Sequence, residues 1–312
     1  MAKETRVIID EEVAAMPFEQ AAKEWLEMVD VKKSSKATYR YMVNKKILPE
    51  LAGKTLGEVI WMDEMKDLET QLKAKYKDRA VSNIFTIIRM IIRSKIGSPS
   101  SIGSNEISKN AKITFMKLTE VRRLLKYFRH DEANDPRKIG VLLALYAGMS
   151  IGEICALKWH DISMNELSIY VDKSASRIMK SEGETKSKVE IFQLDDERVV
   201  PINHQLEKWI YMYKHSYAKK EDFVLSNSDK IVEQRTLQFY LEATLKKAGI
   251  VNRYSFSQLR DTFIVYALKN GAEVSVLASI LGISTSVLEN KYQSFLSIRY
   301  ADKARAVANV FF

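Results

Sequence analysis

The sequence predicts a mainly α-helical protein with a small antiparallel β-sheet, divided between two domains. Apolar residues recur at helical spacing along most of the 312 residues, and short β-branched runs are concentrated between residues 167 and 202. A stretch rich in Gly and Ser, residues 97–105, separates a purely helical N-terminal part from the remainder. These observations predict a polar leader at residues 1–16, a helical domain at 17–98, a linker at 99–112 and an α+β domain at 113–312.

The composition is that of a globular protein with an excess of basic side chains. There are 49 lysines and arginines against 40 acidic residues, a formal net charge of +9, which is consistent with a polyanionic partner such as nucleic acid. The single cysteine, Cys155, excludes an internal disulfide and fits a reducing compartment, and the four histidines show no metal-ligand spacing. Because the N-terminal residues contain no long apolar run, we expect no signal peptide, no membrane span and a cytoplasmic protein.

The N-terminal domain is expected to hold four helices. Helical spacing begins at Phe18, a second helix opens at Ser34, and two more are expected at 62–75 and 80–96. The basic residues on these helices have two interpretations, which are contacts to a nucleic-acid backbone or an ordinary solvated helix surface. The candidates for DNA contact are Lys36, Arg40, Lys46, Arg89 and Arg93.

The second domain combines helices with one short β-rich region. It begins near Ile113, and the sequence GMSIGEICALKWHDI at residues 148–162 follows its first apolar helix. β-Branched runs bounded by polar residues predict the strands, and the helical period predicts the remaining elements. The expected helices are 136–148, 203–217, 232–248 and 297–312, and the expected strands are 167–171, 189–192 and 198–202.

The stretch from Ser255 to Phe295 carries residue types suited to phosphate chemistry. Ser255 followed by Gln258 predicts a capping box, and Arg260 lies in the first turns of the helix that this box begins. A guanidinium can bind a phosphate through two parallel hydrogen bonds. The hydroxyl of Tyr292, further along, belongs to the group of side chains that can attack a phosphate.

Three motifs in this part of the chain have a familiar arrangement. Residues 257–263 are SQLRDTF, residues 281–283 are LGI, and Tyr292 stands nine positions after Ile283. This arrangement resembles the tyrosine recombinases, or phage-integrase family, whose motifs are H-x-L-R-H-T-F, L-G-H and a tyrosine nine positions after that last histidine. The family's G-x-R-x-x-E-x-x-x-L-x-W motif corresponds to residues 148–159, with matches at Gly148, Glu153, Leu157 and Trp159.

The resemblance implies a helical core-binding domain at 17–98, a catalytic-type domain at 113–312, and double-stranded DNA as the partner. Family members cut DNA without metal or cofactor, because a tyrosine attacks a phosphodiester and forms a 3′-phosphotyrosyl link. Two arginines and a histidine stabilise the developing charge, and a hairpin lysine protonates the leaving oxygen. The C-terminal helix either packs on its own domain or docks into a neighbouring subunit, so a homo-oligomer and a complex with an active recombinase are the expected assemblies.

Most charged positions of the family motif are substituted in this chain. Arg260 and Tyr292 stand in catalytic positions and Glu153 in a supporting position. Asp261 replaces a common second histidine and places a negative charge beside the expected phosphate site. The degenerate catalytic positions are Ser150 in place of an arginine, Ser257 in place of a histidine, Ile283 in place of a histidine or tryptophan, and Leu194 in place of the hairpin lysine.

Three lysines are candidates to replace the lysine that the resemblance places at Leu194. Lys186 and Lys188 lie close to that position and require a different hairpin register, whereas Lys173 is more distant. All three are also candidates for contacts to DNA.

Three hypotheses follow from this pattern. The first is a mobile-element recombinase or integrase that binds DNA but is catalytically impaired. The second is a working site-specific recombinase in which other residues, or a partner subunit, supply the missing charges. The third is a protein-interaction scaffold without DNA. A lysine that reaches Arg260 and Tyr292 would favour the working enzyme.

Overall fold

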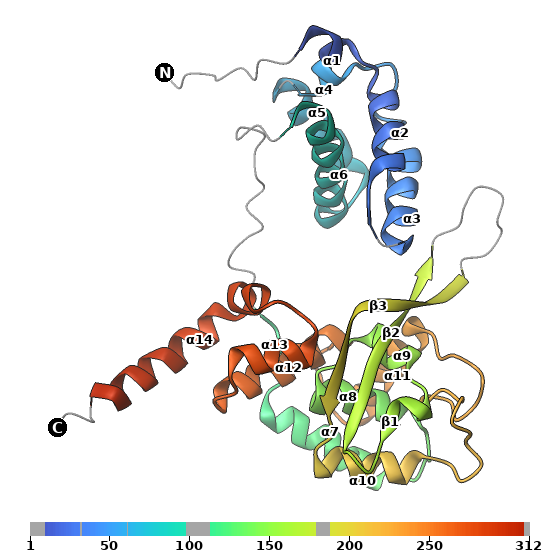
Figure 1. Ribbon diagram of the computed structural model, residues 1–312, viewed down its shortest axis with the longest axis vertical. Helices are drawn as coiled ribbons and strands as arrows, with labels where there is room; N and C mark the ends of the chain where they lie inside the picture. Colours follow the sequence, from blue (N-terminus) through green and yellow to red (C-terminus); the bar gives the residue numbers. More distant parts are fainter. Residues whose placement is uncertain (1–9, 32, 61, 98–112, 179–187, 309–312) are drawn as a thin grey trace. The chain divides into compact units, whose positions relative to one another are not determined.

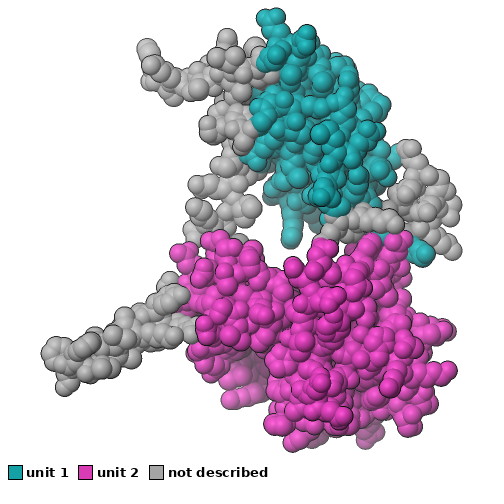
Figure 2. Space-filling view, viewed as in Figure 1, with its two compact units in different colours: residues 1–108, 177–188 teal, residues 109–176, 189–312 magenta. Residues whose placement is uncertain are grey.

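The computed structural model describes residues 10–31, 33–60, 62–97, 113–178 and 188–308, and leaves the side chains at 33–34, 62–65 and 297–308 undescribed. The chain separates into two compact units (Figure 2). Unit 1 comprises residues 1–108 and 177–188, and unit 2 comprises residues 109–176 and 189–312. Helices dominate both units, and the three strands form one antiparallel sheet, as the sequence predicts.

Unit 1 is built from helices around an apolar centre. The amphipathic α2, η1 and α6 contribute Phe18, Trp25, Ile47, Ile84 and Ile88 to this core. The expected helix at 62–75 is present with those bounds, and the helix expected at 80–96 begins two residues earlier. The helices are α1 (Glu11–Ala15), α2 (Phe18–Met28), α3 (Lys33–Met42), the π-helical η1 (Val43–Ile47), α4 (Leu56–Ile60), α5 (Met62–Lys75) and α6 (Asp78–Ile96).

The region expected as a polar leader contains α1. The side chain of Asp10 accepts a hydrogen bond from the backbone of Glu12 and caps this helix. α1 packs against α4 so closely that a Cβ at Gly57 would lie 3.0 Å from the carbonyl oxygen of Ala14. The short apolar face of α1 therefore contributes to unit 1.

Unit 2 is organised around α8 (Arg137–Ala147), which is buried along nearly its whole length and contacts α9, α10, α11 and α12 (Figure 1). A helix that is apolar on all sides must lie at the centre of a domain. Its last residue is followed by Gly148 in the left-handed region, at φ 63°. The other helices are α7 (Leu118–His130), α9 (Ile151–Ala156), the 3-10 helix η2 (Trp159–Asp161), α10 (His204–Tyr213), α11 (Gln234–Lys247), α12 (Phe256–Lys269), α13 (Val274–Leu281) and α14 (Thr285–Ala308).

The sheet has the order β1-β2-β3, with β1 at Ile162–Ser163, β2 at Ser168–Ile178 and β3 at Lys188–Pro201. Ile162 pairs with Ile169 and Ser163 with Ser168. The predicted break between strands at 193–197 is wrong, because β3 is continuous there. As an edge strand with one solvated face, β3 places Gln193, Asp195 and Glu197 outward and so accommodates the polar run.

α12, α13 and α14 form a satellite apolar cluster that includes Ile264, Leu281, Leu288 and Tyr292. α14 consists of two helical segments that meet at a kink, where Tyr292 has non-helical backbone angles, φ −111° and ψ 21°. The helix expected at 297–312 is thus the second half of α14, whose backbone is described to Ala308. Its expected apolar face lies among side chains outside the described residues. Within the described part of the chain, no helix is long and apolar enough to cross a membrane.

We expect Gly148→Ala to lower the free energy of unfolding by about 2–5 kcal/mol. A Cβ at this position would lie 2.5 Å from Phe263 Cδ1 and 2.8 Å from Leu281 Cδ2, in addition to the backbone penalty of a positive φ. The matched control is Gly249→Ala, because Gly249 has φ 68° and nothing within 4 Å of its built Cβ. The control should lose only about 1–2 kcal/mol in urea denaturation; equal losses in both variants would contradict the close packing at Gly148.

Candidate active site

The carboxylate of Glu153 lies at the centre of the candidate site. It belongs to α9, whose N-cap is Ser150, and the two residues form a reciprocal capping box. The backbone N–H of Ser150 donates to Glu153 Oε2 at 2.8 Å, and the backbone N–H of Glu153 donates to Ser150 Oγ at 3.4 Å. The local sequence therefore fixes this carboxylate at the start of a helix.

Two arginines from distant parts of the sequence approach the same carboxylate. Arg198 on β3 places Nη2 2.9 Å from Glu153 Oε2, and Arg260 on α12 places Nη1 3.7 Å from it. The Arg198 contact is an ion pair rather than an aligned hydrogen bond, since this Nη2 has no hydrogen-bond partner of good geometry. Only 8% of the Arg198 side chain and 16% of the Arg260 side chain are exposed. A buried carboxylate thus compensates two guanidinium groups.

Both arginines also bind the C-terminal end of α13. Arg198 Nε donates to the carbonyl of Ile280 at 2.8 Å, and Arg260 Nη2 donates to the carbonyl of Leu281 at 2.7 Å. These carbonyls have no partner within their own helix, and the negative end of the helix dipole favours cations. Gly282 follows at φ 63°, and a Cβ there would lie 2.9 Å from Arg198 Nη1, so a glycine permits this close approach.

Tyr292 is buried in the apolar cluster of α12, α13 and α14, with 1% of its surface exposed. Its hydroxyl donates to Asp261 Oδ1 at 2.6 Å. Burial raises the pKa of Tyr292, and the hydrogen bond to the Asp261 carboxylate and its negative charge raise it further. The nearby Arg260 opposes this shift in pKa without reversing it. The phenol is therefore neutral and hydrogen-bonded to a carboxylate.

The same oxygen of Asp261 accepts a second bond. Lys291 Nζ donates to Asp261 Oδ1 at 2.8 Å and lies 5.1 Å from the centroid of the Tyr292 ring. The Asp261 side chain is 11% exposed, whereas 48% of the Lys291 side chain is exposed. Asp261, Lys291 and Tyr292 therefore form one hydrogen-bonded group, and Asp261 directly follows Arg260 in the sequence. Burial lowers the pKa of Arg260, and Glu153 is the largest influence against that change.

The four degenerate positions hold side chains with structural surroundings of their own. Ser150 caps α9, and Ser257 is exposed in the first turn of α12, beside the predicted capping box of Ser255 and Gln258, which is confirmed. Ile283 packs against the α12–α14 cluster. Leu194 on β3 packs against the main core of unit 2. None of these four side chains can carry a charge.

The candidate lysines occupy different surroundings. Lys173 on β2 donates to Asp161 at 2.7 Å and is 3.1 Å from Asp172. Burial alone would lower the pKa of Lys173, but these two carboxylates outweigh it and the pKa is raised. Lys188 is exposed at the start of β3, and Lys186 lies outside the described residues.

The basic candidates of unit 1 lie on three helical elements. Lys36 and Arg40 are four residues apart on α3, and Lys36 Nζ donates to the carbonyl of Glu27 at 3.2 Å. Lys46 on η1 lies over the ring of Tyr76 at 3.9 Å. The other two candidates, Arg89 and Arg93, are one turn apart on α6. Burial and the neighbouring charge of Arg93 lower the pKa of Arg89, while the charge of Glu69 opposes this change.

The sequence motifs did not identify Arg198 and Lys291 as residues of the site. Side chains alternate between the two faces of a strand, and Arg198 lies on the same face of β3 as the inward-facing Leu194 and Val200. Its guanidinium therefore points into the domain, where a charged group needs a partner. Lys291 directly precedes Tyr292, and only the packing of α14 on α12 shows that its ammonium meets Asp261. For Arg198, the usable signals were the parity of β3 and the match of Arg198, Pro201 and Ile202 to the R-x-x-P-L phrase of the family that the sequence resembles.

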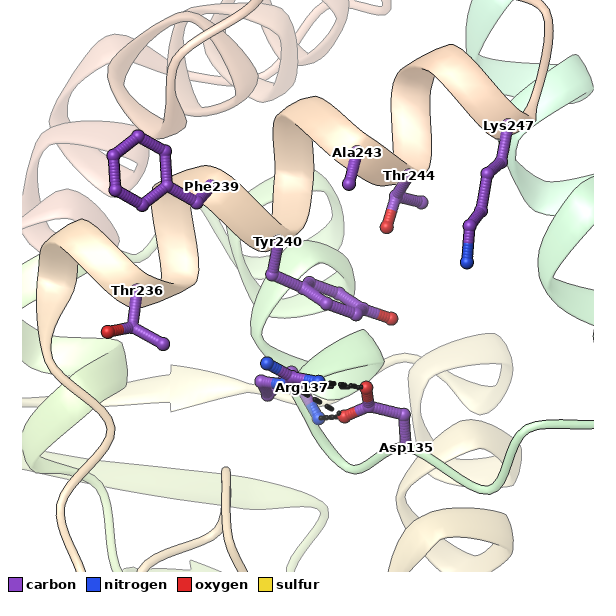
Figure 3. A pocket seen from close by; sticks show the side chains of 8 residues that line it. All are labelled: Asp135, Arg137, Thr236, Phe239, Tyr240, Ala243, Thr244 and Lys247. Atoms are coloured by element: carbon purple, nitrogen blue, oxygen red, sulfur yellow. Dashed lines mark hydrogen bonds and ion pairs between the residues drawn. The ribbon is translucent and has the colours of Figure 1, made fainter.

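A separate pocket of about 410 Å³ lies along α11 (Figure 3). Arg137 forms a bidentate pair with Asp135, the shortest contact being 2.7 Å, and its guanidinium lies over the Tyr240 ring at 4.6 Å. The lining residues are Asp135, Arg137, Thr236, Phe239, Tyr240, Ala243, Thr244 and Lys247, and none of them belongs to the Glu153 site. Among the described residues, no cluster of His, Cys, Asp or Glu could hold a metal ion.

Comparison with known families assigns the chain. The model of the phage integrase family matches residues 114–294, more than half of the 312 residues. The chain belongs to the phage integrase family. All residues of the Glu153 and Asp261 groups lie inside this match.

Individual relatives of this integrase-family chain are distant. It is 26% identical over 207 residues to the integrase of Salmonella phage P22, covering 65% of this chain and 49% of the relative. It is 28% identical over 169 residues to a tyrosine recombinase of Thermosipho africanus, covering 54% of this chain and 52% of the relative. The chain thus spans about half the length of these relatives.

Solved structures share the fold at low sequence identity. The Tn1549 transposon integrase in complex with transposon right end DNA matches with a TM-score of 0.70 and 14% identity, covering 89% of this chain and 95% of that one. A lambda integrase tetramer bound to a Holliday junction matches with a TM-score of 0.60 and 14% identity, covering 87% and 76%.

We expect Glu153→Gln to lower the free energy of unfolding by about 3–5 kcal/mol, because it leaves two buried guanidinium groups without their carboxylate. The control is Glu69→Gln, since Glu69 forms an exposed pair with Lys73 at 2.7 Å. Its loss should be about 0–1 kcal/mol. Combining Glu153→Gln with Arg198→Met should cost less than the sum of the two single variants. Equal losses of unfolding free energy in Glu153→Gln and Glu69→Gln would show that Glu153 does not stabilise the two buried arginines.

Proposed function

We propose that this chain is a DNA-binding tyrosine recombinase-like protein of a mobile element in which strand cleavage is impaired. The observation that most supports the proposal is the identity and bonding of the side chain at position 150. Where the family motif has an arginine, Ser150 is a neutral helix cap bonded to Glu153. A serine at this position cannot supply a positive charge to a phosphate.

The expected loss in rate follows from the number of missing donors. Removing one oxyanion donor lowers an enzyme's rate by about 10²–10³. Positions 150, 194, 257 and 283 together lack a guanidinium, an ammonium and two hydrogen-bonding rings, as the family motif has them. These losses are not additive, but they support a site that binds far better than it cuts.

Arg198 does not remove this deficit. It brings a second guanidinium to Glu153, yet the group is almost fully buried and lies against Gly282. Its contacts to Glu153 and Ile280 serve the packing of β3, α9 and α13. We therefore assign Arg198 a structural role and Arg260 the phosphate contact.

DNA is the partner that the comparisons favour. The Tn1549 and lambda integrases that share the fold were solved with DNA. The net charge of +9 is consistent with a polyanion, and the Arg89–Arg93 pair offers like charges for it. We also propose assembly with further copies through α14, or with an active recombinase, and a cytoplasmic location, where the buried Cys155 thiol would stay reduced.

One observation favours a working recombinase as the second candidate. Lys291 reaches the group that holds Tyr292, through Asp261. However, its ammonium and the Tyr292 hydroxyl bind the same carboxylate oxygen, so they approach from the side of the attacking group. In an in-line displacement the leaving oxygen departs from the opposite side. Lys291 is therefore badly placed to protonate it.

Covalent trapping tests the impairment. Nicked duplexes that carry the ends of the element encoding this chain should give no adduct with the wild type above the level of Tyr292→Phe, measured by denaturing gel electrophoresis. An active integrase on its own nicked site serves as the positive control. A wild-type adduct that disappears in Tyr292→Phe would contradict the impairment and favour the working recombinase.

Salt dependence tests the DNA contact. Affinity for the same duplexes should fall steeply between 50 and 200 mM salt, by about 10³–10⁵ for a protein that makes 6–10 phosphate contacts. The double variant Arg89→Ala, Arg93→Ala should weaken binding and flatten this dependence in fluorescence anisotropy. Lys23→Ala, in an exposed pair with Glu19 at 2.8 Å, is the matched control. Binding that is absent, or insensitive to salt, would argue against DNA as the partner.

A further inference from the structure

We propose that Asp261 is a positioning residue that holds Tyr292 and Lys291 as an internal substitute for a phosphate. This inference deepens the proposed function and rests on Tyr292 standing in the nucleophile position. According to this inference, the Asp261 carboxylate keeps the tyrosine in an inactive arrangement. This effect is separate from the substitutions at positions 150, 194, 257 and 283.

The geometry of the donors is the first argument. The hydroxyl of Tyr292 and the ammonium of Lys291 lie 2.6 and 2.8 Å from one oxygen, Asp261 Oδ1. A hydroxyl and an ammonium are donors of the kind that bind a phosphate oxygen. In this structure both donors are directed at an anion that belongs to the protein itself.

The fixed position of the carboxylate is the second argument. Asp261 lies on the buried side of α12, and the residue after it, Thr262, is bonded to the backbone of Met116 at 2.9 Å. Tyr292 packs among Leu288, Leu296 and other apolar side chains of the α12–α14 cluster. A tyrosine held by packing and by a charged hydrogen bond cannot turn its oxygen toward an external phosphate without breaking that bond.

Electrostatics is the third argument. The charge of Asp261 acts on the Arg260 guanidinium and opposes the lowering of its pKa, so a phosphate bound by Arg260 would be repelled by this carboxylate. The carboxylate also holds Tyr292 in its protonated, weakly nucleophilic form. Phosphate and Asp261 therefore compete for Lys291 and Tyr292, and loss of the carboxylate favours the phosphate.

The test follows the reactivity of Tyr292 itself. Asp261→Asn removes the charge with little change in shape, and Asp261→Ala removes the acceptor as well. Tetranitromethane nitrates the phenolate form of exposed tyrosines, and tryptic cleavage after Lys291 releases YQSFLSIR, residues 292–299, in which Tyr292 is the single tyrosine. Both variants should raise nitration of this peptide several-fold, because loss of the charged hydrogen bond lowers the pKa of the Tyr292 phenol and frees its ring to leave the buried position between α12 and α14.

Two variants control for general effects. Glu120→Gln neutralises another carboxylate that accepts a tyrosine hydroxyl, from Tyr254 at 2.8 Å, and should leave nitration of Tyr292 at the wild-type level. Lys291→Met leaves the bond between Tyr292 and Asp261 and removes the compensating cation, so nitration of Tyr292 should not rise; because this variant loses the tryptic site at 291, the peptide to follow is residues 270–299, in which Tyr292 is again the single tyrosine. Thermal melts followed by circular dichroism show which variants are folded, and the near-isosteric Asp261→Asn keeps the test decisive if Asp261→Ala unfolds.

The nicked-duplex assay separates this inference from the proposed function. Higher nitration together with a new Tyr292-dependent adduct would support Asp261 as the positioning group and show that the phosphate site can still react. Higher nitration without an adduct would support Asp261 equally and assign the inactivity to the missing charges. Unchanged nitration in the folded Asp261 variants would overturn the inference whatever the adduct assay gives. An adduct with the wild type would contradict only the impairment.

Discussion

The candidate site depends on one buried carboxylate with two guanidinium partners. Glu153 connects α9 to β3 through Arg198 and to α12 through Arg260, while both arginines bind the end of α13. Four elements that are distant in sequence thus meet around a single charge. Because removing water from three ionised groups is costly, loss of any one of them would leave buried charge without a partner and weaken the contacts among these elements.

A second carboxylate gives the site its unusual character. Asp261 stands beside Arg260 and binds both Tyr292 and Lys291, so each cation of the site already has an anionic partner within the protein. Lys291 and the Tyr292 hydroxyl are hydrogen-bonded within the protein, whereas Arg198 Nη2 makes an ion pair with Glu153 but no aligned hydrogen bond.

Three of the four substituted positions hold side chains with a structural role, whereas Ser257 is exposed. Ser150 completes a capping box, Ile283 fills the cluster beneath α13, and Leu194 packs on the main core. Helix caps and buried apolar groups each contribute on the order of a kcal/mol to stability. The positions have therefore become part of the scaffold. The fold of the phage integrase family is retained because its core and its Glu153 network do not need the missing charges.

The sequence by itself determined the class of the protein. Helical periods predicted most of the helices, the capping box at Ser255 and Gln258 is where the pattern placed it, and the spacing of three motifs indicated the family. These signals are local, since a cap or a helical period involves residues within a few positions of one another. The continuous β3 was missed because the polar run at 193–197 has the same local composition in a turn as on the solvated face of an edge strand.

The tertiary structure alone decided the partners of the charged side chains. Asp261 and Tyr292 are separated by 31 positions, and Arg198 and Ile280 by 82, so no local pattern relates them. Which donor meets which acceptor depends on how α12, α13, α14 and β3 pack, and that packing is set by apolar contacts spread over the whole unit. The sequence could count the charges of the site, but only their positions in space show that they neutralise one another.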